Sequence, residues 1–106
     1  GYIARPHLGV AVQSVRLHES LREKLHLERD AGVIVFGLET AGPAERAGVL
    51  VGDIFLSVDG QPVSDTMDLQ QALAGLIGRT VPATMVRGGD LVHLDVAPGE
   101  RPHGSR

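Results

Sequence analysis

The sequence predicts a small α+β domain, in which five or six short strands form a sandwich or a partly open barrel capped by two or three helices. Three observations lead to this expectation. An apolar strand-like run at 33–36 is followed by a stretch, 41–63, that combines a helix, a buried strand and a hairpin. A helical pattern covers 66–76. Two strand-like segments joined by a glycine turn then fill 80–97.

The N-terminal part is expected to hold a linker, a strand and a short helix. Residues 1–6 are interpreted as a linker from an upstream domain, and 8–12 as the first strand. Ser20 and Glu23 have the spacing of a capping box, in which each side chain bonds a free amide at the start of a helix. A helix is therefore predicted over 20–27.

The stretch 41–63 carries the strongest local signals in the chain. Pro43 suits the first turn of a helix, where its missing N–H would have no partner in any case. Gly48 suits the left-handed residue that closes a helix. Residues 54–58 form an apolar run typical of a buried strand, and Asp59-Gly60 is a strong signal for a two-residue hairpin turn.

A second helix is predicted after this stretch. Asp65 or Thr66 is expected to cap it, because a side-chain oxygen at that position accepts a bond from a free amide of the first turn. The helix is expected to run to about Leu76, with Gly78 beyond its end.

The C-terminal part is expected to be a hairpin followed by a tail. Pro82 places the strand 80–87 near an edge or at a strand start. Residues 88–90 are a turn, and 91–97 alternate apolar and polar side chains as a half-buried strand does. Residues 98–106 are interpreted as a flexible tail, so the folded domain is predicted to span 7–97.

The composition excludes several classes of function. The chain has 106 residues, no cysteine and a formal net charge of −3. It lacks the basic stripe with aromatic side chains expected of a nucleic-acid partner, and its apolar runs are too short for a membrane span. The five histidines lack metal-ligand spacing and no nucleophile motif surrounds a serine, so we expect no metal, no cofactor and no catalytic residue.

The stretch 41–63 resembles the central segment of PDZ domains, in the form found in bacterial serine proteases of the HtrA/Deg type. The resemblance covers roughly residues 7–97 and implies that the chain binds the free C-terminus of a polypeptide by adding it as a strand to a sheet edge. It also implies that the parent protein is a serine endopeptidase whose catalytic residues lie outside this chain.

Residues 7–10 are similar to the carboxylate-binding loop of this family. The resemblance implies that the amides of Leu8, Gly9 and Val10 hold the peptide carboxylate, as successive backbone amides do in anion-binding nests. Arg5 either adds a positive charge there or belongs to a solvated linker. His7 replaces the usual aromatic residue and is expected at the rim of the groove.

The opposite wall of the groove is expected to be the predicted helix over 66–76. Its core-facing residues are predicted to be Leu69, Ala72 and Leu76. Leu73 is either a groove residue or an ordinary core leucine. With no histidine at the helix start, we expect a preference for an apolar terminal side chain. Besides His7, the residues assigned to the groove and pocket are Ala11, Val12, Gln70, Leu73 and Ile77.

The segment 15–29 allows two interpretations. It is similar to a helical excursion that many HtrA-like PDZ domains carry, which implies a contact with a protease domain or a neighbouring subunit. Alternatively, Leu17, Leu21 and Leu25 simply complete the core, and we favour this second interpretation.

The expected function is that of a peptide-binding module of an HtrA-like protease in the periplasm or cell envelope. Its expected partners are C-termini of unfolded or substrate proteins and the upstream protease domain, which implies a role in protein quality control. One alternative is a structural or assembly domain with a vestigial groove. Another is the same module in a different envelope protease or in a secretion component.

Overall fold

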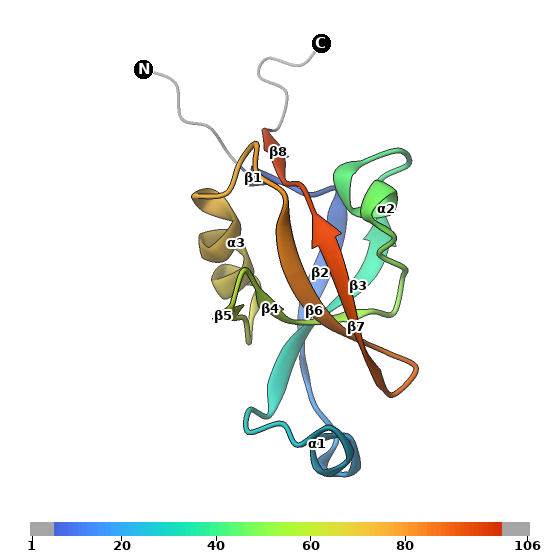
Figure 1. Ribbon diagram of the computed structural model, residues 1–106. Coiled ribbons are helices and arrows are strands. Elements are labelled where there is room, and N and C mark those ends of the chain that lie inside the picture. The colour runs from blue at the N-terminus through green and yellow to red at the C-terminus, as the bar shows by residue number, and fades with distance from the viewer. Residues whose placement is uncertain (1–5, 101–106) are drawn as a thin grey trace.

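A six-stranded antiparallel sheet is the largest feature of the computed structural model, which describes residues 6–100 (Figure 1). The spatial order is β2-β3-β4-β6-β7, and the short β5 pairs with β4. These strands are β2 Val10–Arg16, β3 Ala31–Leu38, β4 Ile54–Val58, β5 Gln61–Pro62, β6 Val81–Arg87 and β7 Asp90–Val96. Because the sheet ends at β2 on one side and at β7 on the other, it is open and not a closed barrel.

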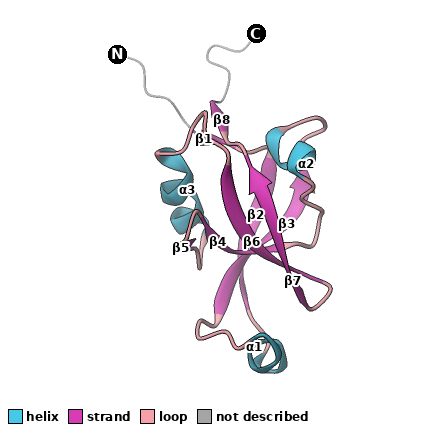
Figure 2. Ribbon diagram, in the orientation of Figure 1, coloured by secondary structure: helices cyan, strands magenta, loops and turns pink. Residues whose placement is uncertain are grey.

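Three helices in the described residues complete the α+β fold predicted from the sequence. They are α1 Glu19–Leu25, α2 Pro43–Ala47 and α3 Thr66–Ala74. Figure 2 shows α2 and α3 on opposite sides of the strands, with α1 at the far end of an arm formed by β2 and β3. The prediction of an α+β fold with two or three helices is confirmed.

A second, two-stranded sheet joins the two ends of the described chain. It pairs β1 Pro6–His7 with β8 Gly99–Glu100 in antiparallel register. The Pro98 side chain is fully buried, and its carbonyl accepts a hydrogen bond from the Gly78 amide at 3.0 Å. The predicted tail 98–106 therefore begins with ordered residues, because β1 supplies a partner strand. The other residues of the predicted linker and tail, 1–5 and 101–106, lie outside the described residues.

The stretch 41–63 folds as its turn residues predict. Pro43 is the first residue of α2, and Gly48 closes that helix with φ 96°. Strand β4 follows, with Val58 fully buried. Asp59 and Gly60 have φ values of 51° and 79° and form the tight turn between β4 and β5. Both left-handed residues match the type of hairpin turn for which Asp-Gly is favoured.

The boundaries of α1 differ from the prediction. The N-cap is His18, no side chain caps the helix, and Ser20 lies inside the first turn, so the capping-box prediction is wrong. The physical reason is tertiary packing: Leu17 is buried with two sheet residues, and the α1 leucines Leu21 and Leu25 pack against that cluster. The excursion completes a second core, as the favoured interpretation expected.

Helix α3 starts where it was predicted but ends earlier. Asp65 is the N-cap, and its carboxylate accepts a hydrogen bond from the Asp68 amide at 2.7 Å. The helix stops at Ala74, and Leu76 lies in a following turn, where its amide bonds the Leu73 carbonyl at 2.9 Å. The early stop shortens the wall that this helix presents to β2.

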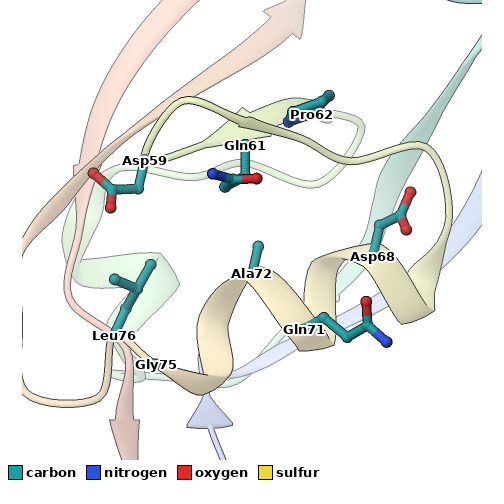
Figure 3. A pocket seen from close by; sticks show the side chains of 8 residues that line it. All are labelled: Asp59, Gln61, Pro62, Asp68, Gln71, Ala72, Gly75 and Leu76. Atoms are coloured by element: carbon teal, nitrogen blue, oxygen red, sulfur yellow. The ribbon is translucent and has the colours of Figure 1, made fainter.

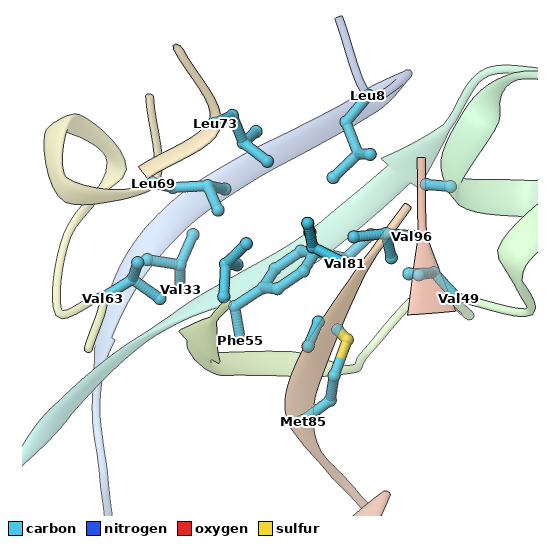
Figure 4. Packing of buried hydrophobic residues seen from close by; sticks show 14 of the residues in the cluster. Leu8, Val33, Val49, Phe55, Val63, Leu69, Leu73, Val81, Met85 and Val96 are labelled. Carbon is cyan, nitrogen blue, oxygen red and sulfur yellow. The ribbon is translucent and has the colours of Figure 1, made fainter. Parts of the chain in front are cut away.

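The main core lies between the sheet and helices α2 and α3. Phe55 and Met85 are its largest fully buried side chains, and Figure 4 shows α3 leucines and Leu8 converging on the same apolar volume. Side chains of α3 and of β2, the two elements that border the candidate site, both pack against this core.

Candidate functional site

Strand β2 offers an unpaired edge beside α3. Its partner on one side is β3, and no strand of the described residues pairs with its other side. Helix α3 contacts β2 along this edge (Figure 1). An edge strand presents a row of free N–H and C=O groups, which is a template for another extended chain. Val10, Ala11 and Val12 all lie on this edge strand and are partly buried.

The turn that leads into β2 is built around Gly9. Its φ of 78° lies in the left-handed region, which moves the start of the strand from the predicted residue 8 to Val10. The carbonyls of Leu8 and Gly9 accept hydrogen bonds from the amides of Ala44 and Glu39, each at 2.8 Å. The loop between β3 and α2 therefore occupies the carbonyl side of this turn.

The amides of the same turn are left without backbone partners. Within residues 6–100, the Leu8 and Gly9 amides donate no backbone hydrogen bond. Successive amides around a left-handed residue form the concave nests that bind anions. Binding of a carboxylate by these amides stays a prediction, and Arg5 lies outside the described residues.

Glycine is strongly favoured at position 9. A Cβ there would lie 3.2 Å from both Cβ and Oε1 of Glu39 and 3.4 Å from Cδ of Pro43. Its left-handed backbone would strain any other residue as well. The backbone conformation and the limited space therefore both favour glycine at this position.

His7 points toward the β3–α2 loop. Its Nε2 donates a hydrogen bond to Oε1 of Glu39 at 2.7 Å, and the His7 side chain is only 13% exposed. The predicted rim residue therefore bonds the β3–α2 loop on the carbonyl side of the turn at Gly9. Glu39 was missed in the sequence, where it lies 32 residues from His7 and belongs to no motif.

The α3 wall presents leucines at positions 69 and 73. Leu69 and Leu73 are the buried residues of the helix, whereas Ala72 is only partly buried. The predicted core stripe of Leu69, Ala72 and Leu76 is confirmed, because both leucines are buried and the partly buried Ala72 packs against the same core. Leu73 is 4% exposed and belongs to the main core cluster, with its side chain beside Leu8 (Figure 4).

The two remaining wall residues lie nearer the surface. Gln70 is exposed on α3, and Ile77 is partly buried in the turn after the helix. Partly buried Val10 and Val12 pack against the core cluster that contains Leu73. The facing parts of β2 and α3 thus form one apolar strip.

A separate cavity lies on another face of α3. It has a volume of about 340 Å³ and lies between the helix and the β4–β5 turn (Figure 3). Its lining residues are Asp59, Gln61, Pro62, Asp68, Gln71, Ala72, Gly75 and Leu76. None of the predicted groove residues is among them, so this cavity is distinct from the β2 edge.

A buried carboxylate, Asp53, is held by an ion pair that involves none of the predicted site residues. Asp53 is 1% exposed, and Arg87 donates to both of its carboxylate oxygens, at 2.9 and 2.7 Å. Burial by itself raises the pKa of Asp53. The hydrogen bond from Arg87, the amide of Leu50 and the guanidinium charge outweigh burial, so the pKa lies below its ordinary value. The same pair raises the pKa of Arg87, mainly through the hydrogen bond to Asp53.

Two kinds of feature are missing from residues 6–100. No three His, Asp or Glu side chains there are grouped so that they could hold a metal ion. None of the described helices has the length and apolar character needed to cross a membrane.

Comparison with protein families matches residues 6–97 to the PDZ domain model. A probable periplasmic serine endoprotease, DegP-like, from Pseudomonas putida is 35% identical over 103 residues, which are 96% of this chain and 21% of that relative. A relative of the same description from Halomonas elongata is 34% identical over 107 residues, with the same two shares. The chain thus spans about a fifth of the length of the curated relatives that it matches.

Solved structures give the same similarity. The HtrA-type protease AlgW with a decapeptide is 35% identical, with a TM-score of 0.74, and the match covers 93% of this chain and 30% of that one. The HtrA3 PDZ domain bound to a phage-derived ligand, FGRWV, is 25% identical, with a TM-score of 0.72 and coverage of 95% and 91%.

Proposed function

The chain belongs to the PDZ-domain family, and on this premise we propose that it captures the free C-terminus of a polypeptide by adding it as a strand to β2. The observation that carries the proposal is the turn at Leu8 and Gly9. Its carbonyls bond the β3–α2 loop, and its amides have no backbone partner within residues 6–100. A peptide carboxylate placed there would accept hydrogen bonds from these amides, at the start of the open edge of β2.

The peptide backbone would pair with Val10, Ala11 and Val12. Its last side chain would lie against the apolar strip between β2 and α3, with Leu73 at the base and Gln70 and Ile77 toward the surface. An apolar terminal side chain fits this strip, and the ligand of the HtrA3 PDZ domain ends in valine. Burial of one such side chain contributes about 1.5–3 kcal/mol before association costs. We therefore expect a Kd on the order of micromolar or weaker.

The similarity to DegP-like relatives supports a role for this module within a larger protein. We propose that the parent is a periplasmic serine endoprotease and that this chain supplies its peptide site but not its nucleophile. In that setting the module delivers exposed C-termini of unfolded or substrate proteins to an upstream protease domain, in the service of protein quality control.

The proposed binding mode predicts where a peptide will perturb the domain. Titration of the ¹⁵N-labelled chain with a short peptide ending in valine should shift the amides of residues 8–12 and 69–77. The other edge strand, β7, should be unaffected, because its free edge lies at the opposite end of the sheet. A peptide of the same sequence ending in aspartate serves as the control and should bind more weakly. Shifts confined to β7 or to the cavity of Figure 3 would contradict strand addition at β2.

A further inference from the structure

The contact between His7 and Glu39 ties the carboxylate loop to the loop behind it. We propose that Glu39, acting through His7, is a positioning residue that holds the amides of residues 8–10 in the orientation that binds a peptide carboxylate. This inference rests on the proposed function. It assigns a task to a side chain that would touch no part of the peptide.

Glu39 contacts the carboxylate loop in three ways. Its amide donates to the Gly9 carbonyl at 2.8 Å. Its carboxylate accepts the hydrogen bond from His7 at 2.7 Å. Its Cβ and Oε1 lie in the space that a side chain at residue 9 would need. The Gly42 amide bonds the Glu39 carbonyl at 3.0 Å and closes the turn that carries this residue.

Together these contacts help to fix both ends of a short segment. His7 belongs to β1, Gly9 lies just before β2, and Leu8 between them is anchored by its buried side chain. Backbone bonds from the β3–α2 loop hold the carbonyls of the turn, and the His7 ring is bonded to the same loop. The amides of the turn therefore have little freedom to change their direction. Preorganisation of this kind raises affinity by reducing the cost of ordering the site on binding.

The charge on Glu39 has the opposite effect. A carboxylate close behind the loop repels a peptide carboxylate and weakens its binding. Positioning and repulsion therefore predict opposite results when Glu39 is truncated, and this makes the proposal testable. A glutamine at position 39 separates the two effects, because its Oε1 still accepts the bond from His7 and its charge is zero.

The test compares two peptides that are identical except for a free C-terminal carboxylate or a C-terminal amide. Affinities are measured by isothermal titration calorimetry for the wild-type chain and for Glu39→Ala, Glu39→Gln and His7→Phe. We expect Glu39→Ala and His7→Phe each to lower affinity for the acid peptide about fivefold, as the loss of one such pair implies. Affinity for the amide peptide should not change. Glu39→Gln should restore binding of the acid peptide to at least the wild-type level.

Two further variants guard against a purely structural explanation. Glu45→Ala removes a hydrogen bond from the Ala41 amide in the same loop, at 2.6 Å, and should leave the acid-to-amide ratio unchanged. The double variant of His7→Phe and Glu39→Ala should lose no more than either single one, because the two residues act through one contact.

Each outcome bears on a distinct claim. Glu39→Ala and His7→Phe could keep the wild-type ratio of affinity for the acid peptide to affinity for the amide peptide. That result overturns the positioning role alone. Tighter binding of the acid peptide by Glu39→Ala also overturns it, since repulsion then dominates. Equal binding of both peptides by the wild type would remove the proposed carboxylate capture and this inference with it.

Discussion

Replacement of Arg87 with methionine is expected to lower the melting temperature by about 15 °C, the largest stability effect that we predict for a single substitution. The reason is the state in which Asp53 is left. Its side chain is 2% exposed, and both of its oxygens bond the Arg87 guanidinium. Removal of the guanidinium leaves a buried carboxylate with only the Leu50 amide, at 2.8 Å, as a hydrogen-bond partner, which costs more than the pair itself contributes. Thermal unfolding followed by circular dichroism measures the shift.

An exposed ion pair provides the matched control. Arg16 and Asp30 lie 3.5 Å apart, with side chains 81% and 61% exposed. Exposed pairs contribute little, so Arg16→Met should shift the melting temperature by no more than about 2 °C. Similar shifts for the two methionine variants would contradict the account of Asp53.

The loss of stability in Arg87→Met should also depend on pH. In the wild-type chain the folded pKa of Asp53 lies below its unfolded value of 3.8. Its contribution is therefore complete above that value and is lost as the pH falls through the folded pKa. In Arg87→Met the buried, unpaired carboxyl has a raised pKa, so protonation relieves its cost. The difference in stability between the two proteins should narrow on acidification from pH 7 to pH 4.

The second large effect concerns binding. Gly9→Ala is expected to lower affinity for a peptide with a free C-terminus at least about tenfold. This loss corresponds to about 1.4 kcal/mol of binding free energy. The alanine Cβ would meet Glu39 at 3.2 Å, and a left-handed φ of 78° strains it further. The turn must shift to relieve both, and its amides shift with it. Fluorescence anisotropy with a labelled peptide measures the loss.

Gly60 offers a closely matched control for backbone strain. Its φ is 79°, and a Cβ there would meet no atom within 4 Å. Gly60→Ala should therefore destabilise the fold through the same left-handed strain and leave peptide affinity unchanged. If Gly9→Ala binds as tightly as Gly60→Ala, the turn at residue 9 is not the carboxylate site.

The parts of the fold that were predictable depend on local backbone chemistry. Pro43, Gly48 and Asp59-Gly60 each specify a conformation that neighbouring residues cannot change, and all of them lie where they were expected. The Ser20 signal failed because a capping box is a weak preference. Packing of the leucines around Leu17 decides the start of α1 instead.

The site was less predictable because its contacts are long-range. The resemblance pointed to the loop at 7–10 and to the wall at 69–77. It could not give the rotation of α3 about its axis, which decides how deeply each side chain of the helix is buried. In the structure Leu73 belongs to the core cluster, at the base of the apolar strip between β2 and α3. The pairs His7–Glu39 and Asp53–Arg87 join residues 32 and 34 positions apart, and no spacing rule connects them.

Carboxylate-dependent capture at the β2 edge is the central claim, and one comparison tests it most directly. The wild-type chain is titrated with a peptide ending in valine and with the same peptide carrying a C-terminal amide. The structure predicts a Kd on the order of micromolar for the free acid and binding at least about tenfold weaker for the amide, because the Leu8 and Gly9 amides lose their charged partner. Equal affinity for the two peptides, or no binding of either, would contradict it.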